Sequence, residues 1–441
     1  MPYIKKSALF VSGSFFFAAQ AFAGAPNFID SRAMAMGGVG VASARPAAAG
    51  FFNPALLAVK QPEKRDGFGM LLPSVNAIAS DEAELRDVVD DFDDDFIKPF
   101  EGAITDVENN IAGGGAGLAA AQTELANRTR ALNNELQKID QEQARVDLGM
   151  GVSALIPSQR FGAGLFVSGS ARIAAKINYN DQTTLDQLED LARNTVITDI
   201  DDVNALYDTA NDADQLQSTV RAVGSAYSQV GLSMSHNFTF FGHDYALGVS
   251  PKMVDLRAYD FVTSVDEFES DDLEDTKVSE SKFNLDLGVA SFLDDDEQLL
   301  VGLSVINVVP MEITTKPGRD NTNLGPGFAP QGIDIELKPK VLAGISYQGA
   351  SYELAADLEL TKTEEVFGEG DTQYLGVGAE YDLAEIFQLR AGARYNIAES
   401  EDVLLTAGFG LRAAGVTLEL AALGSTDANT VGAGLQFGVT F

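Results

Sequence analysis

The final residues of the chain alternate between apolar and small or polar side chains. The apolar set is Val431, Ala433, Leu435, Phe437, Val439 and Phe441, and Gly432, Gly434, Gln436, Gly438 and Thr440 lie between its members. A period of two predicts a β-strand with one face toward lipid and the other toward water or small packed groups. A soluble edge strand with such a face would promote aggregation, whereas the closing strand of a bacterial outer-membrane barrel requires it.

Alternation of the same kind predicts 14 strands along the chain. We expect them at about 67–78, 146–155, 161–173, 224–237, 244–257, 281–292, 298–309, 338–348, 351–362, 372–382, 387–397, 402–412, 415–423 and 430–441. An even number of strands is typical of a single-chain outer-membrane barrel. Three prolines fall in or beside these segments, namely Pro73, Pro251 and Pro310. Proline has no amide hydrogen to donate to the ladder, so each could allow a strand kink or a lateral opening in the wall.

The connections between these segments alternate between two classes. One class is short and falls on one side of the barrel, near 157, 242, 295, 349, 384 and 414. The other class falls on the opposite side, at 79–145, 178–222, 262–280, 312–331, 363–371, 397–402 and 424–429. Short periplasmic turns and longer outer loops are what an outer-membrane barrel shows. The sequence therefore predicts an antiparallel transmembrane β-barrel.

The long loops are acidic and partly helical. Twelve acidic residues lie between Asp81 and Glu108, against only Arg86 and Lys98. Apolar residues at helical separations follow, namely Leu118, Leu125, Leu132, Leu136 and Ile139. This spacing predicts one or two amphipathic helices in the first insertion, and the segment from 185 to 220 is similar.

Composition narrows the function classes. The net charge of -35 argues against a nucleic-acid partner, because phosphate backbones require clustered Lys and Arg. Cysteine is absent, which excludes disulfides and thiolate metal sites, and we expect no cofactor. Tryptophan is also absent, so interfacial anchoring would fall to the 11 Tyr and 27 Phe.

The second half of the predicted barrel has a polar inward face. Its members are Lys340, Glu353, Asp357, Glu359, Glu380, Gln388, Arg390, Arg394, Arg412 and Glu419. Charged groups facing lipid would cost about 2–4 kcal/mol each at the midplane, so this register is strongly fixed. Arg390 or Arg394 could pair with Glu380 across the lumen. The pairs either fill and brace the interior or belong to a permeation path, and the sequence leaves both interpretations open.

The first residues indicate export. Lys5 and Lys6 precede an apolar run that ends in Ala21-Phe22-Ala23, an A-x-A cleavage pattern before Gly24. We expect residues 1–23 to be a signal peptide, since the apolar run is shorter than the roughly 20 residues of a spanning helix. An exported, membrane-embedded chain without such helices must satisfy its backbone in a closed barrel.

Residues 24–60 fit neither a barrel strand nor a linker, and here the chain resembles a known family. The stretch from Ser31 to Ala42, with Met34, Met36, Gly37, Gly38 and Gly40, is followed by Phe51-Phe52-Asn53-Pro54-Ala55. This arrangement resembles the N-terminal hatch of the FadL-like superfamily of outer-membrane fatty-acid transporters. It is most similar to the plasmid-transfer (conjugal transfer) TraF-type barrel family. The resemblance implies diffusion of a hydrophobic molecule past the hatch and sideways or down through the wall.

A hatch also has a physical rationale, because a 14-stranded barrel is wider than side chains can fill. Gly37, Gly38 and Gly40 permit tight turns, and Asn53, Pro54 and Ala55 complete the hatch motif. Met34, Met36, Phe51 and Phe52 supply adaptable apolar surface and are the candidate ligand contacts. Ordinary packing of these four side chains against the wall is the alternative.

Two other chemistries find little support in the residues. The acidic run Asp90–Asp95 offers oxygen ligands but lacks the Gly and terminal Glu of an EF-hand, so we predict no metal site. An enzymatic barrel would need a His-centred site, and His236 and His243 both lie at a predicted periplasmic turn without a Ser or Asp constellation. We expect no catalysis.

The sequence thus predicts an all-β membrane protein, a 14-stranded antiparallel transmembrane β-barrel over 61–441 with an N-terminal hatch at 24–60 and helical extracellular loop insertions. The preferred function is passive uptake of hydrophobic small molecules, fatty-acid or hydrocarbon-like, across the outer membrane of a Gram-negative bacterium. The alternative is a conjugal-transfer-associated structural or surface-contact role. Expected partners are outer-membrane lipid and lipopolysaccharide, the hydrophobic ligand, and the barrel assembly machinery through the C-terminal strand.

Overall fold

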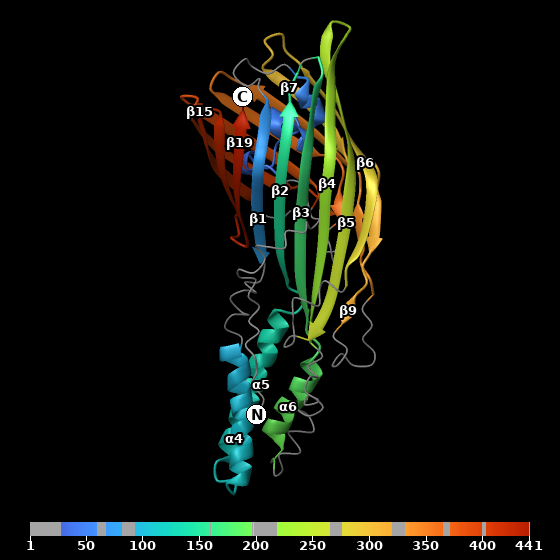
Figure 1. Ribbon diagram of the computed structural model, residues 1–441. Coiled ribbons are helices and arrows are strands. Elements are labelled where there is room, and N and C mark those ends of the chain that lie inside the picture. The colour runs from blue at the N-terminus through green and yellow to red at the C-terminus, as the bar shows by residue number, and fades with distance from the viewer. Residues whose placement is uncertain are drawn as a thin grey trace.

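A computed structural model describes residues 28–59, 68–81, 93–158, 160–195, 197, 218–264, 276–319, 331–364, 371–398 and 403–440. Within this part of the chain, 14 antiparallel strands close into a barrel (Figure 1). The expected signal peptide and Phe441 lie outside the described residues.

The barrel strands follow the chain order around the ring, and the pairings β1–β19 and β4–β5 leave no gap in it. They are β1 (Gly69–Asp81), β2 (Gln143–Ile156), β3 (Gly162–Asn178), β4 (Thr219–Phe240), β5 (His243–Ser264), β6 (Val278–Phe292), β7 (Leu299–Ile306), β11 (Lys340–Gln348), β12 (Tyr352–Glu359), β15 (Tyr374–Leu383), β16 (Phe387–Asn396), β17 (Leu404–Ala413), β18 (Val416–Ser425) and β19 (Thr430–Thr440). Each overlaps one predicted segment, so the predicted strand count and fold class are confirmed.

The alternation places apolar side chains outside. On β19, Leu435 and Phe437 are 41% and 43% exposed, whereas Gln436 between them is 7% exposed. Ten of the barrel strands carry two or more exposed large apolar side chains, and β1, β7, β11 and β17 carry one each, namely Val75, Leu303, Ile345 and Leu405. This continuous outer band is the surface that hydrocarbon covers in a membrane barrel.

A charge placed on that band should be costly. Leu420 lies at the centre of the outward face of β18 and is 45% exposed. We expect Leu420→Arg to lower the free energy of unfolding from lipid vesicles by about 2–4 kcal/mol. Ala120→Arg, on an exposed helical position beyond the barrel, is the matched control and should change it by less than about 0.5 kcal/mol. Equal effects of the two substitutions would contradict the assignment of this face to lipid.

The two ends of the barrel differ. Tight connections such as Phe241–Gly242, 384–386 and 414–415 join strands at one end, which we call the turn end. All long insertions leave from the opposite end, the loop end, as the alternation of short and long connections predicts. Figure 1 shows β2–β5 running toward the helices at the loop end.

Strands β4 and β5 are much longer than a membrane requires. Each has 22 residues, against about 9–11 for a spanning strand. The outward apolar side chains of β5 end at Met253, and the paired Asp255 and Arg257 follow. The predicted strands 224–237 and 244–257 are therefore too short at the loop end. There both faces of β5 are covered, since Tyr259, Asp260 and Phe261 are all buried, and the two-residue period disappears.

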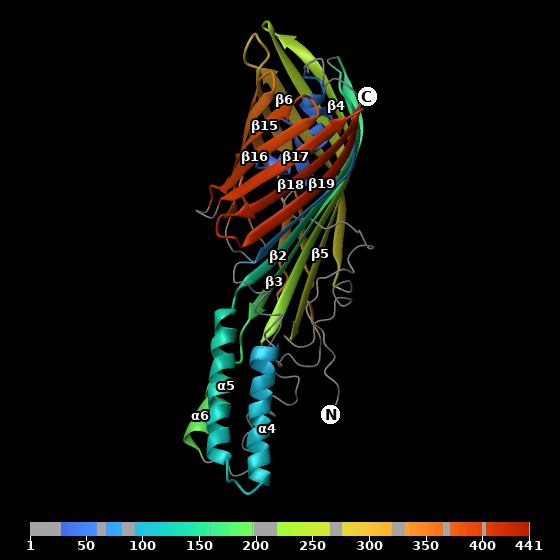
Figure 2. The ribbon, with the colours of Figure 1, turned by 90° about the vertical axis from the view of Figure 1, so that its left-hand side faces the viewer.

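Three helices form a tip beyond the loop end (Figure 2). They are α4 (Lys98–Ala112), preceded by the short π-helical turn η4 (Asp93–Ile97), α5 (Leu118–Lys138) and α6 (Gln182–Asn194). Leu125, Leu132, Leu136, Leu185 and Leu188 are buried between them, which confirms the predicted amphipathic helices. Burial acts to raise the pKa of Glu189 at this tip, but hydrogen bonds from Arg193 and Arg130 outweigh it and leave the pKa below its ordinary value.

Short strands occupy segments that the sequence predicts as loops. They are β8 (Met311–Thr314), β9 (Gly318–Arg319), β10 (Asp334–Leu337), β13 (Thr363–Glu364) and β14 (Asp371–Thr372). β8 pairs with β10, and Met311, Ile313 and Ile335 pack on the inner face of β4 and β5. Segments of four residues or fewer are too short for a periodic signal, so pairing and packing decide them.

Residues 28–59 lie inside the barrel and are called the hatch segment here (Figure 2). Its elements are α1 (Ser31–Ala35), η2 (Pro46–Ala48), α2 (Ala49–Phe52) and η3 (Pro54–Leu57). Nearly all of its residues are buried.

Candidate functional site

Local hydrogen bonds set the shape of the hatch segment. Asp30 caps α1 by accepting hydrogen bonds from the amides of Arg32 and Ala33 at 2.7 and 3.2 Å. Gly37 and Gly38 end that helix with φ of 72° and 85°, the left-handed region that favours glycine. The predicted role of these two glycines in a tight turn agrees with this geometry.

Asn53 joins the hatch segment to the wall. Its Oδ1 accepts from the amide of Ala55 at 3.1 Å and caps η3, whose first residue is Pro54. Its Nδ2 donates to the carbonyls of Val41 and Val289 at 3.0 and 3.2 Å. One fully buried amide therefore fixes two parts of the hatch segment and strand β6.

A belt of inward-facing glycines surrounds the hatch segment. Its members are Gly149, Gly248, Gly288, Gly302, Gly344, Gly376, Gly378, Gly392 and Gly408. A Cβ added at any of them would lie closer than 3.0 Å to an atom of the hatch segment. At Gly248 those atoms are backbone atoms of Pro54 and Ala55, and at Gly376 the atom is the carbonyl oxygen of Gly37. Because no wall side chain intervenes, the hatch segment lies directly against the strands.

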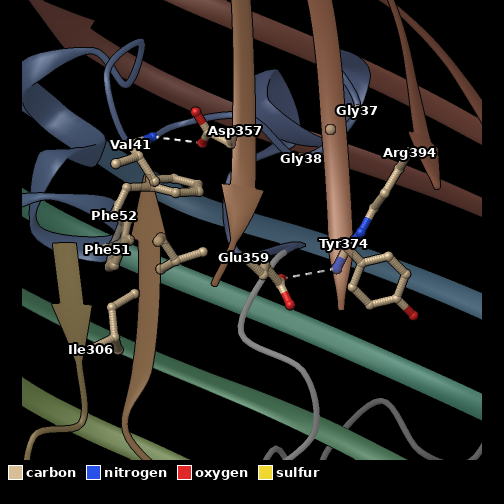
Figure 3. A pocket seen from close by; sticks show the side chains of 12 residues that line it. Gly37, Gly38, Val41, Phe51, Phe52, Ile306, Asp357, Glu359, Tyr374 and Arg394 are labelled. Atoms are coloured by element: carbon tan, nitrogen blue, oxygen red, sulfur yellow. Dashed lines mark hydrogen bonds and ion pairs between the residues drawn. The ribbon is translucent and has the colours of Figure 1, made fainter. Parts of the chain in front are cut away.

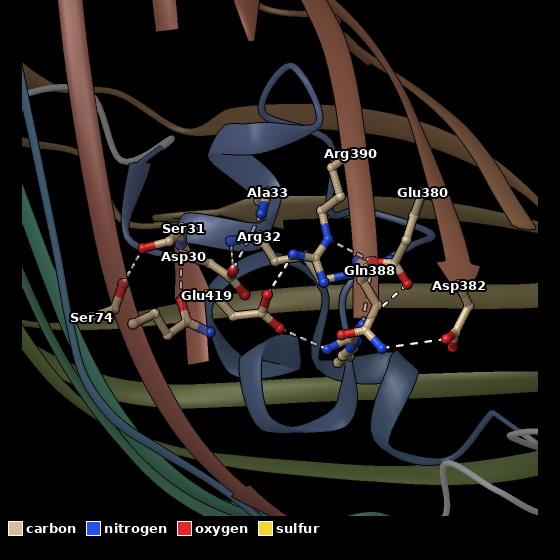
Figure 4. A network of polar contacts seen from close by, with 12 residues as sticks. Asp30, Ser31, Arg32, Ala33, Ser74, Glu380, Asp382, Gln388, Arg390 and Glu419 are labelled. Atoms are coloured by element: carbon tan, nitrogen blue, oxygen red, sulfur yellow. Dashed lines mark hydrogen bonds and ion pairs between the residues drawn. The ribbon is translucent and has the colours of Figure 1, made fainter. Parts of the chain in front are cut away.

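Buried ion pairs join the hatch segment to one side of the wall (Figure 4). Arg32 contacts Glu353 and Glu380 at 2.9 and 2.8 Å. Arg45 contacts Glu380 and Glu419 at 3.1 and 2.9 Å. Arg390 of β16 contacts Glu380 at 2.7 Å and also Glu419. Three guanidinium groups thus neutralise three carboxylates, all on the turn-end side of the hatch segment.

The predicted lumen charges lie on the inner face of the barrel, and of the two arginines proposed as partners of Glu380 the structure pairs Arg390 with it. Arg390 pairs with Glu380, whereas Arg394 contacts Glu359 at 3.5 Å and not Glu380. Arg412 also faces the lumen side of β17, where it is half-buried. Sequence reasoning did not identify Arg32 and Arg45. The available signal was that Arg32 and Arg45 are, with Asp30, the only charged residues in the apolar stretch 28–59.

A small cavity lies on the loop-end side of the hatch segment (Figure 3). Val41, Phe51, Phe52, Ile306 and Leu342 form its apolar lining, and Asp357, Glu359, Tyr374 and Arg394 form its polar lining, together with Gly37, Gly38 and Gly376. Its volume is about 30 Å³, whereas an apolar cavity that binds benzene is on the order of 150 Å³. An organic ligand can enter only if side chains move.

Two charged side chains present unused hydrogen-bonding capacity at this cavity. Asp357 Oδ2 accepts from the amides of Gly40 and Val41 at 2.6 and 2.8 Å, but its Oδ1 has no partner among the described residues. Arg394 Nη1 is likewise without a partner in that part of the chain. The Arg394 guanidinium lies 3.6 Å from the ring centre of Tyr374 and 4.9 Å from that of Phe28.

The four candidate ligand contacts do not gather at one place. Phe51 and Phe52 line the cavity. Met34 is fully buried against Ile78, Ala421 and Leu423, and Met36 packs with Val39 and Ala355. A ligand role for the two methionines remains a prediction, since the cavity lining does not include them.

No group of three or more His, Asp or Glu side chains in the described ranges has the geometry to hold a metal ion. Most of the acidic run Asp90–Asp95 lies outside those ranges. The ring of His236 packs edge-on against Phe238 on the outer face and contacts the carbonyl of Arg160. In the described ranges no helix is both long and apolar enough to span a bilayer.

The model of the family described as "F plasmid transfer operon, TraF, protein" matches residues 50–359. The chain belongs to this family. The match confirms the resemblance inferred from the hatch motif and covers the Asn53 joint, the β4–β5 extension and the helical tip. No curated protein matches the chain.

A solved structure shares the fold of this TraF-family barrel. The monoaromatic hydrocarbon channel CymD aligns with a TM-score of 0.50 and 12% sequence identity, over 95% of this chain and 99% of CymD. The toluene transporter TodX of Pseudomonas putida aligns with a TM-score of 0.42 and 10% identity, over 92% of this chain and 96% of TodX. At these identities the CymD likeness extends to the fold alone.

Proposed function

We propose that this TraF-family barrel mediates passive uptake of hydrophobic small molecules across the outer membrane of a Gram-negative bacterium. The observation that carries the proposal is an unbroken apolar cluster inside the barrel. It begins with Phe51 and Phe52 at the cavity and continues through Leu56 and Leu57 to Leu155 at the turn end. A barrel with a purely structural role would not require this continuous apolar cluster beside its hatch segment. The naming of CymD as a hydrocarbon channel adds support.

The proposed arrangement assigns a role to each part of the chain. Residues 1–23 act as a signal peptide, 24–60 as the hatch and 61–441 as the barrel, with the loop end outside the cell. Lipid and lipopolysaccharide cover the outer band, and the barrel assembly machinery recognises the C-terminal strand. The ligand enters at the loop end, because the cavity lies on that side of the hatch segment. No catalytic step is part of this function.

Uptake can be measured in vesicles whose outer leaflet contains lipopolysaccharide. We expect vesicles that contain the protein to admit radiolabelled toluene and laurate faster than vesicles without protein, and to exclude sucrose. A variant that lacks residues 24–55 should admit sucrose as well, because a 14-stranded barrel without its interior segment leaves an open pore. Equal toluene and laurate entry with and without the protein would end the uptake proposal.

A structural role in conjugation is the second candidate. The observation that favours it is the helical tip of α4, α5 and α6, which projects beyond the barrel where it could contact another cell (Figure 1). Replacing residues 98–138 by a short Gly-Ser linker would separate the two functions. A transfer role predicts fewer transconjugants with normal uptake, whereas an uptake role predicts normal conjugation.

A further inference from the structure

The hatch segment meets the wall in two chemically different ways. Toward β12, β15, β16 and β18, its arginines are held by the buried carboxylates of Glu353, Glu380 and Glu419. Toward β1, β2 and β3, the contacts are made by apolar side chains such as Leu71, Leu155 and Phe166 and by hydrogen bonds between neutral groups. Ser31 donates to Asn76 of β1, and Ser153 of β2 donates to the carbonyl of Ala47. Separating buried ion pairs is costly, whereas apolar contacts have no directional partner to lose. A path around the hatch segment therefore lies on the side where its contacts are neutral.

One aromatic side chain fills the wall on that side. Phe166 of β3 is 1% exposed and is among the largest fully buried side chains that the structure describes. Its ring meets that of Phe51 edge to face, with ring centres 5.7 Å apart and planes at 85°. Phe51 also lines the loop-end cavity. The two rings thus lie between the cavity and the leucines at the turn end.

Phe166 stands where the close backbone contact of the glycine belt is interrupted. On β2, Gly149 lies against the carbonyl of Phe28, and on β5, Gly248 lies against the backbone of Ala55. On β3 the close contact lies nearer the turn end, where Gly162 meets the backbone of Leu57, and farther along β3 and beside β4 the Phe166 ring occupies the space. A Cβ at Gly231 of β4 would overlap that ring, and one at Gly50 of the hatch segment would lie 3.0 Å from it.

The neighbouring ladder is also weakened at this level. β4 pairs with β5 at Gly231 and again at Met234, but Leu232 and Ser233 make no ladder pair with Pro251 and Ser250. Proline has no amide hydrogen to donate. The hydroxyls of Ser233 and Ser250 meet at 2.8 Å instead. Fewer ladder hydrogen bonds between β4 and β5 therefore break when the wall beside Phe166 shifts.

We propose that Phe166 is the gate of the uptake path, and that rotation of its ring away from Phe51 opens a passage between α2 and the β3–β4 wall. This inference rests on the proposed uptake function. Phe51, Phe166 and the neutral hydroxyl of Ser233 line the passage, so it admits slender, neutral molecules and offers a charged group no opposite charge. Aromatic ligands can replace the Phe51–Phe166 contact with an equivalent one.

The test uses the full chain in lipopolysaccharide-bearing vesicles, with N-phenyl-1-naphthylamine as a neutral fluorescent probe. We expect Phe166→Ala to accelerate probe entry roughly tenfold, as a barrier lowered by about 1.4 kcal/mol would. Phe166→Trp should slow entry below the wild-type rate. Phe161→Ala is the matched control, because Phe161 precedes β3 on the outer face, is 58% exposed and should leave the rate unchanged.

A reversible variant protects the test against simple misfolding. The chain contains no cysteine, so Phe166→Cys introduces a unique thiol. We expect this variant to be fast, to become slow after coupling to benzyl methanethiosulfonate, and to recover after reduction. Wild-type entry above that of empty vesicles, with Phe166→Ala, Phe166→Cys and the wild type all equal, would overturn the gate while the uptake function stands. Wild-type entry equal to that of empty vesicles would instead remove the uptake function itself.

Discussion

Glu380→Ala is expected to lower the free energy of unfolding by about 3–5 kcal/mol, the usual cost of removing one partner from a buried ion pair. Glu380 is 2% exposed and accepts from Arg32, Arg45 and Arg390 at once. Without it, three buried guanidinium groups share the two remaining carboxylates. Unfolding by urea in lipid vesicles, followed by the heat-dependent shift in gel mobility, measures the loss.

An exposed pair supplies the control for this experiment. Glu364, in a short hairpin at the loop end, has a side chain 72% exposed and contacts Lys338 at 3.3 Å. Glu364→Ala should change stability by at most about 1 kcal/mol, since water screens surface pairs. If Glu380→Ala cost no more than Glu364→Ala, the network would not be what anchors the hatch segment. Release of that segment should also let sucrose enter vesicles.

Gly248→Val is expected to displace the hatch segment without preventing strand pairing. A Cβ at this position would lie under 3.0 Å from three backbone atoms of Pro54 and Ala55, which cannot turn aside as a side chain can. Overpacking usually costs about 1–3 kcal/mol, and we expect the upper end here because backbone is displaced. Urea unfolding and sucrose entry report stability and seating separately.

The control for Gly248→Val is Gly102→Val in α4. A Cβ at Gly102 meets nothing within 4 Å, so the larger side chain has room. We expect no loss of stability beyond about 0.5 kcal/mol and no sucrose entry. A sealed, stable Gly248→Val variant would show that the hatch segment is not held directly against β5.

The strands were predictable because lipid imposes a local rule. On β19 or β16, every outward position must be apolar, as at Leu435 or Leu389, and the pattern is complete within about ten residues. Where β4 and β5 leave the membrane, Asp260 and its neighbours are covered on both faces. Outward positions there need not be apolar, so both predicted strands stop short of the loop end.

The candidate site was only partly predictable. Inward charges such as Glu380 and Arg390 followed from strand register, because their neighbours face lipid. The partners in the hatch segment did not, since Arg32 lies 348 residues from Glu380 in the chain. The glycine belt left a signal that could have been used. Four strands carry a glycine at an inward position, namely Gly248, Gly288, Gly302 and Gly344. Their role as the contact surface for the hatch segment is recognisable only when the structure shows that they lie at the same level of the barrel.

By itself, the sequence determined the number of strands, their order, the lipid-facing register and the presence of a hatch motif. The first three follow from the two-residue alternation of apolar side chains, and the last follows from a short contiguous stretch. Tertiary structure alone decided which carboxylates hold Arg32 and Arg45, and where glycine lets backbone touch backbone. It also decided that Phe166 packs edge to face against Phe51. These contacts form only when the barrel closes and places strands that are distant in sequence around the hatch segment. The hatch segment itself has no periodic pattern from which its neighbours could be predicted.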